Sequence, residues 1–102
     1  MEERLFTWDD EKAEINLRKH NVTFTEATEV FNDPSYIEGF DFYHSTKEDR
    51  WRIIGFSTKR LLLVVYCERG TTQAGAIITR IISARRATAS EKTEYESHRG
   101  KN

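Results

Sequence analysis

The chain has 102 residues, the usual length of one domain, and 37% of them are hydrophobic, so its core should be thin. No apolar run approaches the ~18 residues of a membrane-spanning helix, and the start Met1-Glu2-Glu3-Arg4 is unlike a secretory signal. Cys67 has no second cysteine to pair with. These features exclude a membrane span and an internal disulfide. We therefore expect a single domain, residues 1–102, in the cytoplasm.

The net charge of -1 conceals a strong asymmetry between the two halves of the chain. Residues 1–49 contain 13 acids and 5 bases, whereas residues 50–102 contain 4 acids and 11 bases, mostly arginine. The planar guanidinium group of arginine suits phosphate. Two interpretations stay open: the basic half binds a polyanion, or the fold brings the halves together so that their charges pair.

The first elements are predicted from local signals. Residues 4–8 alternate weakly between polar and apolar side chains, which predicts a short edge strand. Asp9 is a typical helix N-cap and is followed by acids in the first turn, which predicts a helix to about His20. Ala13 and Leu17 are four residues apart, so we expect them to share one face of this helix.

A second helix and a run of strands follow. Thr23 and Glu26 have the spacing of a capping box, and Pro34 limits the helix that begins there. Strands are predicted at residues 36–42, 51–56, 61–67 and 77–85. The third of these is apolar on both faces, so it should be the central strand, covered on both sides. Residues 68–75 contain two glycines and are predicted to form a turn.

A third helix is predicted at residues 88–97, because Thr88 and Glu91 again have capping-box spacing. Tyr95 is its only large hydrophobic residue, so this helix should be peripheral or completed by a partner. The predicted fold class is α+β, with two N-terminal helices packed on a mostly antiparallel sheet and a helix at the C-terminus.

The last predicted strand mixes aliphatic and cationic residues. Strict alternation places Arg80 and Arg86 on one face of the sheet and Arg85 on the other. Arginines are rare in a core strand unless they are paired or reach the rim of the sheet. They either form ion pairs with the acidic half or bind phosphate.

Side chains with catalytic potential are few. His20, His44 and His98 are far apart in the sequence and lack the spacing of metal ligands, so we expect no metal site. Cys67 lies in a strongly apolar segment, which favours an inert core residue over a nucleophile.

Two further positions have both a functional and a structural interpretation. Glu68 and Arg69 are adjacent at a strand end, which is compatible with a catalytic pair or with a simple ion pair in a turn. His20 can exchange a proton or cap the end of its helix.

The chain as a whole resembles the BrnT family. The segments that carry the resemblance occur in order at residues 6–12 (Phe-Thr-Trp-Asp-Asp-Glu-Lys), 16–22 (Asn-Leu-Arg-Lys-His-Asn-Val), 26–27, 30–34, 50–55, 61–69 and 80–88, followed by Glu91 and Tyr95. Each motif is weak alone, but their ordered combination is specific and covers most of the chain. The chain departs from the family pattern near residues 71–75, where the turn is longer.

The resemblance implies a toxin of a type II toxin–antitoxin system with a RelE-like fold, which cleaves RNA and arrests translation. It also implies a BrnA-like ribbon-helix-helix antitoxin as partner, and operator DNA contacted indirectly through that antitoxin. An alternative is a non-catalytic binding subunit of the autoregulatory repressor complex.

Metal-independent RNA cleavage needs a base, a proton donor for the leaving oxygen, and positive charge at the phosphate. We expect neither a metal nor a cofactor. The catalytic candidates are His20, Glu68, Arg69, Arg80 and Arg85. The candidates for binding RNA are Lys19, Arg50, Arg52 and Arg86.

Overall fold

The computed structural model contains one five-stranded mixed sheet and three α-helices, which confirms the α+β class. It describes residues 3–99, so Met1 and Glu2 of the charged start lie outside it. The elements in chain order are β1 (Arg4–Thr7), α1 (Asp10–His20), α2 (Phe24–Glu29), the 3-10 helix η1 (Val30–Asn32), β2 (Ile37–Phe40), β3 (Trp51–Phe56), β4 (Leu61–Thr71), β5 (Ile77–Arg86) and α3 (Ala89–Arg99). None of the helices in this described part is long and apolar enough to cross a membrane.

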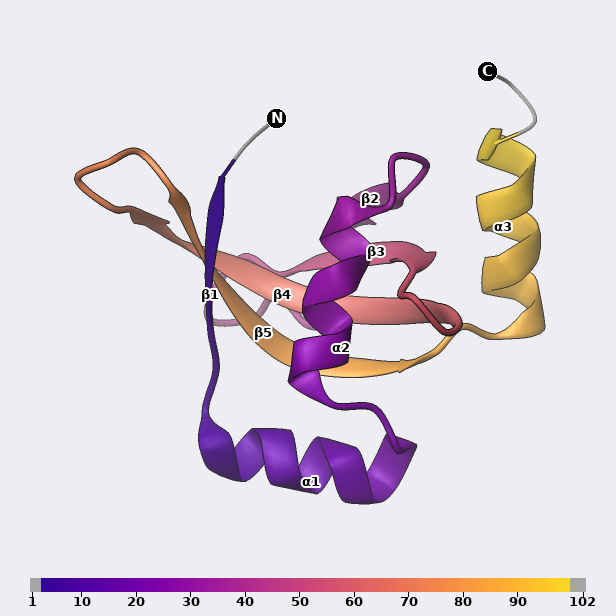
Figure 1. Cartoon of the computed structure of the whole chain (residues 1–102), viewed down its shortest axis with the longest axis horizontal. Helices are drawn as coiled ribbons and strands as arrows, with labels where there is room; N and C mark the ends of the chain where they lie inside the picture. The colour runs from indigo at the N-terminus through magenta and orange to yellow at the C-terminus, as the bar shows by residue number, and fades with distance from the viewer. Residues whose placement is uncertain (1–2, 100–102) are drawn as a thin grey trace.

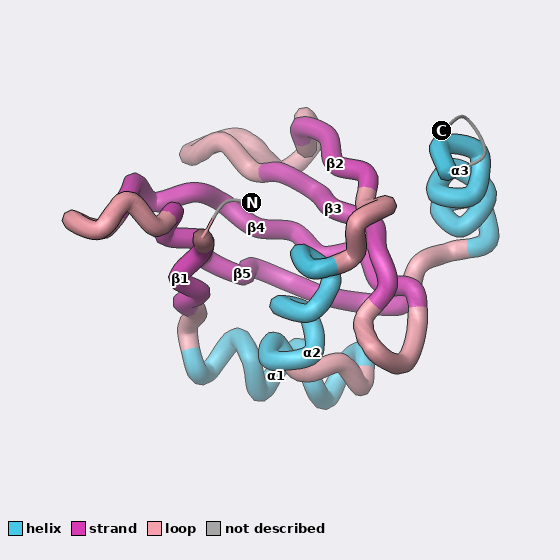
Figure 2. The backbone as a smooth tube through the Cα atoms, turned by 45° about the horizontal axis from the view of Figure 1, so that its top comes forward, coloured by secondary structure: helices cyan, strands magenta, loops and turns pink. Residues whose placement is uncertain are grey.

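The strands lie in the order β1-β5-β4-β3-β2, and β4 is the central strand, as predicted (Figure 2). β1 is an edge strand and runs parallel to β5, while the other three pairs of neighbours are antiparallel. The prediction of a turn at residues 68–75 is partly wrong, because β4 continues to Thr71. The β4–β5 hairpin therefore projects beyond the sheet as an arm (Figure 1), with Gly70 and Gly75 at positive φ near its end.

One face of the sheet carries the main core, and we call it the helix face. α2 crosses in front of it (Figure 1). Leu62, Val64 and Tyr66 of β4 are at most 1% exposed there and pack in one cluster with Phe24 and Ala27 of α2. Burial of a large apolar side chain contributes roughly 1.5–3 kcal/mol, so this cluster is the main source of stability.

α1 flanks the edge of β5 and does not lie on the helix face with α2. Ala13 of α1 packs against the main core, but Leu17 is 42% exposed, and the residue that α1 buries is the polar Asn16, which is 5% exposed. The Asn16 side chain donates to the Ala84 carbonyl (2.8 Å) and the Val22 carbonyl (3.0 Å), and it accepts from the Ala84 N–H (3.1 Å).

The position of Asn16 follows from where β1 ends. β1 pairs with β5 only as far as Arg80, so beyond that residue the backbone groups on the edge of β5 that faces away from β4 have no strand beside them. A buried backbone group without a partner is costly. The amide of Asn16 offers one donor group and one acceptor, and it pairs with Ala84 as a neighbouring strand would.

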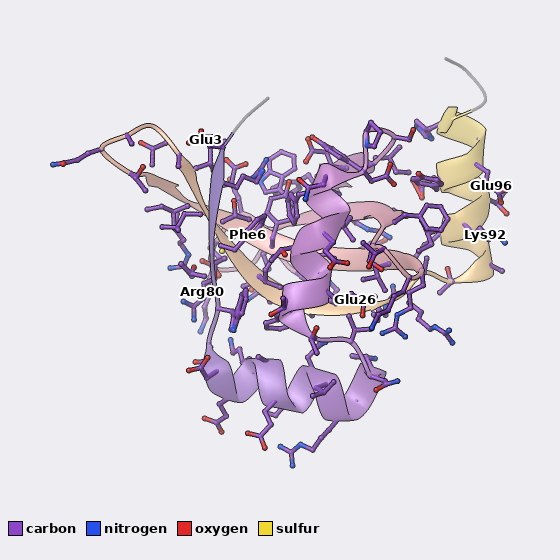
Figure 3. All side chains as sticks on the ribbon, viewed as in Figure 1. Glu3, Phe6, Glu26, Arg80, Lys92 and Glu96 are labelled. Carbon is purple, nitrogen blue, oxygen red and sulfur yellow. The ribbon has the colours of Figure 1, made fainter. Side chains whose placement is uncertain are left out.

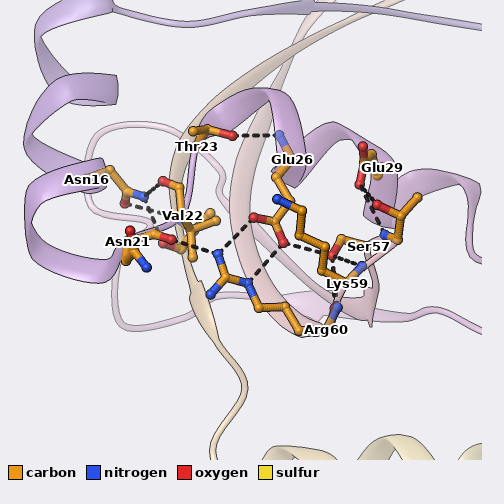
Figure 4. Close-up of polar contacts among 11 residues, drawn as sticks. Asn16, Asn21, Val22, Thr23, Glu26, Glu29, Ser57, Lys59 and Arg60 are labelled. Atoms are coloured by element: carbon orange, nitrogen blue, oxygen red, sulfur yellow. Dashed lines mark hydrogen bonds and ion pairs between the residues drawn. The ribbon is translucent and has the colours of Figure 1, made fainter.

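The second helix start is confirmed in part. The Thr23 hydroxyl accepts from the Glu26 N–H, but the Glu26 carboxylate binds Arg60 and the Ser57 hydroxyl (Figure 4). Arg60 also donates to the Asn21 carbonyl. An acid of the first half thus pairs with a base of the second half and fixes α2 to the β3–β4 turn.

β5 contains a bulge that changes which side chains share a face. Ser83 lies opposite Val65, but Ile81 lies opposite Tyr66, so Ile82 is an extra residue between them. A bulge shifts the phase of the alternation by one. The expectation that Arg80 and Arg85 lie on opposite faces is therefore wrong: they lie opposite Cys67 and Leu63, which share the face opposite the helix face.

α3 stands at the side of the sheet, next to the β3 end (Figure 1). Its capping box is complete, because the Glu91 N–H donates to the Thr88 hydroxyl and the Thr88 N–H donates to the Glu91 carboxylate. Tyr95 packs against Ile54 and Leu63, and its exposed fraction is 2%. Lys92 and Glu96 point away from the sheet (Figure 3), so α3 is attached by a narrow face.

Replacing Asn16 with alanine should reduce the free energy of unfolding by about 2–3 kcal/mol, because Ala84 loses both of its edge partners. Urea denaturation of the purified protein measures this loss. Glu14→Ala is the matched control on the exposed side of α1 and should stay within about 0.5 kcal/mol of the parent. An Asn16→Ala protein as stable as the control would show that the edge of β5 does not need this side chain.

Candidate active site

The face opposite the helix face carries most of the arginines predicted to act, and we call it the open face. Leu63, Val65 and Cys67 of β4 alternate onto it. Arg52 lies opposite Val65, and the bulge in β5 adds Arg85 and Arg80. α3 covers only the end of this face near Leu63, so the arginines remain accessible.

A groove with a volume of about 470 Å³ lies on the open face. Its floor contains Leu63, Val65 and Ser83. Its walls contain charged and polar groups from α1, from residues 41–50, from β3 and β5, and from the start of α3: His20, Asp41, Tyr43, His44, Arg52, Arg85 and Glu91. Segments far apart in the sequence thus bring two histidines and two arginines to one groove.

Glu91 connects the two arginines of the groove. Arg85 donates to both of its carboxylate oxygens, at 2.8 and 3.0 Å, and Arg52 donates at 3.0 Å. One carboxylate between two guanidinium groups leaves a net positive charge. Within residues 3–99, Arg52 is bound through one nitrogen, so its other donors are available to an anion.

The carboxyl of Glu91 is ionised despite its surroundings. Burial opposes its ionisation, but the hydrogen bonds from Arg85 and from the Thr88 backbone, with the charges of both arginines, outweigh burial and lower its pKa. The same hydrogen bond raises the pKa of Arg85. The groove therefore holds this charged cluster at neutral pH.

Residues 41–50 supply the second histidine. Nδ1 of His44 lies 2.8 Å from Oδ2 of Asp41, which is buried. A carboxylate at this nitrogen fixes the ring orientation and, with a proton on Nδ1, leaves Nε2 free to exchange a proton. This Asp–His pair is an arrangement suited to general acid–base chemistry.

His20 reaches the groove because α1 is fixed to β5. It lies four residues after Asn16 and so on the same side of the helix. His20 and Lys19 border a second hollow that is floored by Ile82 and Ser83 of the bulge. The structure therefore places His20 between the groove and this hollow, with Lys19 beside it.

A second cluster lies farther along the open face, toward the β4–β5 arm. Glu48 binds Arg69 at 2.9 Å and approaches Arg50 at 3.8 Å, and Nε of Arg69 lies 3.3 Å from the buried sulfur of Cys67. Arg80 lies opposite Cys67 and has no ion pair among the described residues. These three arginines extend the positive charge of the groove along the strands.

Two predicted site residues are not brought to this face. Glu68 lies opposite Thr79 and approaches Arg4 at 3.6 Å on the helix face. Arg86 lies opposite Leu62 and borders a separate hollow with Lys59 and Arg60. Neither lines the groove with His20 and Arg85.

The sequence did not predict that Asp41, Tyr43, His44 and Glu91 would line this groove. The spacing Asp41-x-x-His44 was the one local signal for the Asp–His pair. Glu91 was identified only as a helix cap, since nothing in the sequence indicates that it would reach two strands.

The described residues contain no group of three or more histidines, cysteines or acids placed to hold a metal ion. The side chains of the groove offer proton exchange and positive charge. Together they can hold a phosphate and move protons on either side of it.

Lowering the pH should weaken the attachment of α3. Because the pKa of Glu91 in the folded protein is below its ordinary value, its contribution to stability is present above that ordinary value and is lost as the pH falls through the folded pKa. Urea denaturation at several acidic pH values should show a smaller dependence on pH for Glu91→Gln than for the parent. Glu94→Gln, exposed on the same helix, is the control and should follow the parent; identical curves for all three proteins would contradict the prediction.

The family model described as "Ribonuclease toxin, BrnT, of type II toxin-antitoxin system" matches residues 8–91, which include every residue that lines the groove. A search of curated proteins found no matching relative.

Proposed function

The chain belongs to the BrnT family of ribonuclease toxins of type II toxin–antitoxin systems, and from this premise we propose that it cleaves RNA in the groove of the open face without a metal ion. The observation that carries the proposal is the convergence of His20, the Asp41–His44 pair, Arg52 and Arg85 on one groove. RNA contains its own nucleophile, the 2′-hydroxyl, so cleavage needs only proton transfer and charge stabilisation.

The two histidines divide the proton transfers. One takes the proton of the 2′-hydroxyl as its oxygen bonds to phosphorus, and the other donates a proton to the 5′-oxygen as the bond from phosphorus to that oxygen breaks. The products are a 2′,3′-cyclic phosphate and a free 5′-hydroxyl. His44 can serve in either role because Asp41 holds its ring through Nδ1.

The two arginines stabilise the phosphate during this transfer. Negative charge on the phosphate oxygens increases as the new bond forms, and guanidinium groups already in place lower the barrier. Glu91 keeps Arg52 and Arg85 together before substrate arrives. Arg50, Arg69 and Arg80 extend the same positive surface, which favours binding of a longer RNA backbone.

The cellular role follows from the same premise. Cleavage of RNA would arrest translation in the cytoplasm, and a BrnA-like ribbon-helix-helix antitoxin would neutralise the toxin. This antitoxin would carry the complex to operator DNA, so the toxin would contact the operator only indirectly.

Replacing His44 with alanine should lower the rate of RNA cleavage by about 10²–10⁴-fold, the usual contribution of a positioned acid or base. His20→Ala should have an effect in the same range. Cleavage of a labelled oligonucleotide by the purified proteins measures the rates, and EDTA should not reduce the rate of the parent.

His98→Ala is the matched control, because His98 lies on α3 outside the groove, where its ring contacts the Glu94 carbonyl. It should cleave at the parental rate. If both groove histidines can be removed without loss, the proposed proton transfers are wrong; if EDTA abolishes cleavage, the metal-independent mechanism is wrong.

Expression of the chain alone should stop cell growth, and co-expression of a BrnA-like antitoxin should restore it. Arg85→Ala should reduce toxicity, because loss of one charge-assisted contact to the transition state costs roughly 10²-fold in rate. Growth curves measure toxicity, and circular dichroism and thermal melting confirm that each variant is folded. Arg86→Ala, the neighbour on the opposite face, should remain toxic; the reverse ranking of the two variants would place the active site on the helix face.

A further inference from the structure

Two adjacent aromatic rings are exposed in residues 41–50, and only one of them has a ring to pack against. Phe42 is 81% exposed, but its ring meets Phe40 edge-on at 4.9 Å, and Phe40 meets Trp51 at 5.3 Å. Tyr43 is 92% exposed and lines the groove. No ring contact or hydrogen bond of its side chain is found within residues 3–99.

The backbone on both sides of Tyr43 is fixed. The Asp41 N–H donates to the Arg50 carbonyl at 2.9 Å, which closes the base of the loop. The Ser45 hydroxyl accepts from the Arg50 N–H and donates to the Asp41 carbonyl. With Asp41 also holding the next residue, His44, the exposed ring of Tyr43 is presented to the groove by an anchored loop.

An exposed ring beside phosphate-binding arginines has the chemistry of a nucleobase platform. Proteins that bind single-stranded nucleic acid combine a positive groove for the backbone with aromatic side chains on which unpaired bases stack. Bases in a duplex are already stacked on one another, so such a ring cannot reach their faces. Aromatic surface is also unfavourable in water, and a base would remove it from water.

We propose that Tyr43 stacks on the nucleobase next to the phosphate held by Arg52 and Arg85, and that the groove thereby selects single-stranded over double-stranded RNA. The proposal rests on the proposed function, because it names the class of RNA that enters the same groove. The ring supplies the contact and the hydroxyl is dispensable, so phenylalanine should replace tyrosine.

The test measures binding apart from cleavage. The probe is a fluorescein-labelled RNA hexamer with 2′-O-methyl groups at every sugar, which cannot be cleaved because it lacks the nucleophile, and the same strand in a duplex. Fluorescence anisotropy gives the dissociation constants. Tyr43→Ala should weaken binding of the single strand by about 5- to 150-fold, the equivalent of one stacked base, and should leave duplex binding unchanged.

Two matched variants separate stacking from other effects. Tyr43→Phe should bind the single strand within about twofold of the parent, since it keeps the aromatic face. Phe42→Ala removes the neighbouring ring outside the groove and should bind both probes as the parent does. Loss of binding in Tyr43→Phe would assign the contact to the hydroxyl and overturn stacking.

The outcomes also distinguish this proposal from the proposed function. If the parent cleaves RNA and His44→Ala does not, but Tyr43→Ala binds the single strand as tightly as the parent, only the stacking proposal is wrong. An equal loss of single-strand and duplex binding in Tyr43→Ala would overturn it as well. If the parent neither binds nor cleaves RNA, both proposals fall.

Discussion

The hydrogen bonds between Asn16 and Ala84 determine the geometry of the groove. They close the edge of β5 where β1 has ended, and they hold α1 against the strand instead of on the helix face with α2. His20 follows Asn16 by four residues and so enters the groove from that edge. A polar contact at a strand edge has direction, which an apolar contact lacks, and it therefore sets the rotation of α1 as well as its position.

Glu91 has a similar double role at the other side of the groove. It begins α3 through a complete capping box and binds the arginines of two strands with the same carboxylate. The narrow attachment of α3 through Tyr95 is thus supplemented by a charged contact. This contact fixes the two arginines in the free protein, as the proposed catalysis requires.

The charge asymmetry of the sequence is resolved in two ways by the fold. Arg60 pairs with Glu26, and Arg69 pairs with Glu48, so part of the basic half is neutralised by the acidic half. Arg52, Arg80 and Arg85 lie on the open face, whereas Arg86 lies on the helix face. The charge-pairing interpretation is therefore confirmed for Arg60 and Arg69, while binding of a polyanion by the other arginines stays a prediction.

Local signals in the sequence determined the helix starts at Asp9, Thr23 and Thr88, the strand at residues 51–56 and the central place of β4, because these features depend on neighbouring residues. The order of the motifs determined the family. The burial of Asn16 and the approach of residues 41–50 to β5 depend on partners distant in the sequence, so no local pattern predicts them. The bulge at Ile82 decided which arginines share a face. Alternation alone places Arg80 and Arg85 on opposite faces. The extra residue is visible only when β5 is paired with β4, and it puts both arginines on the open face. Glu68 and Arg86 lie on the helix face.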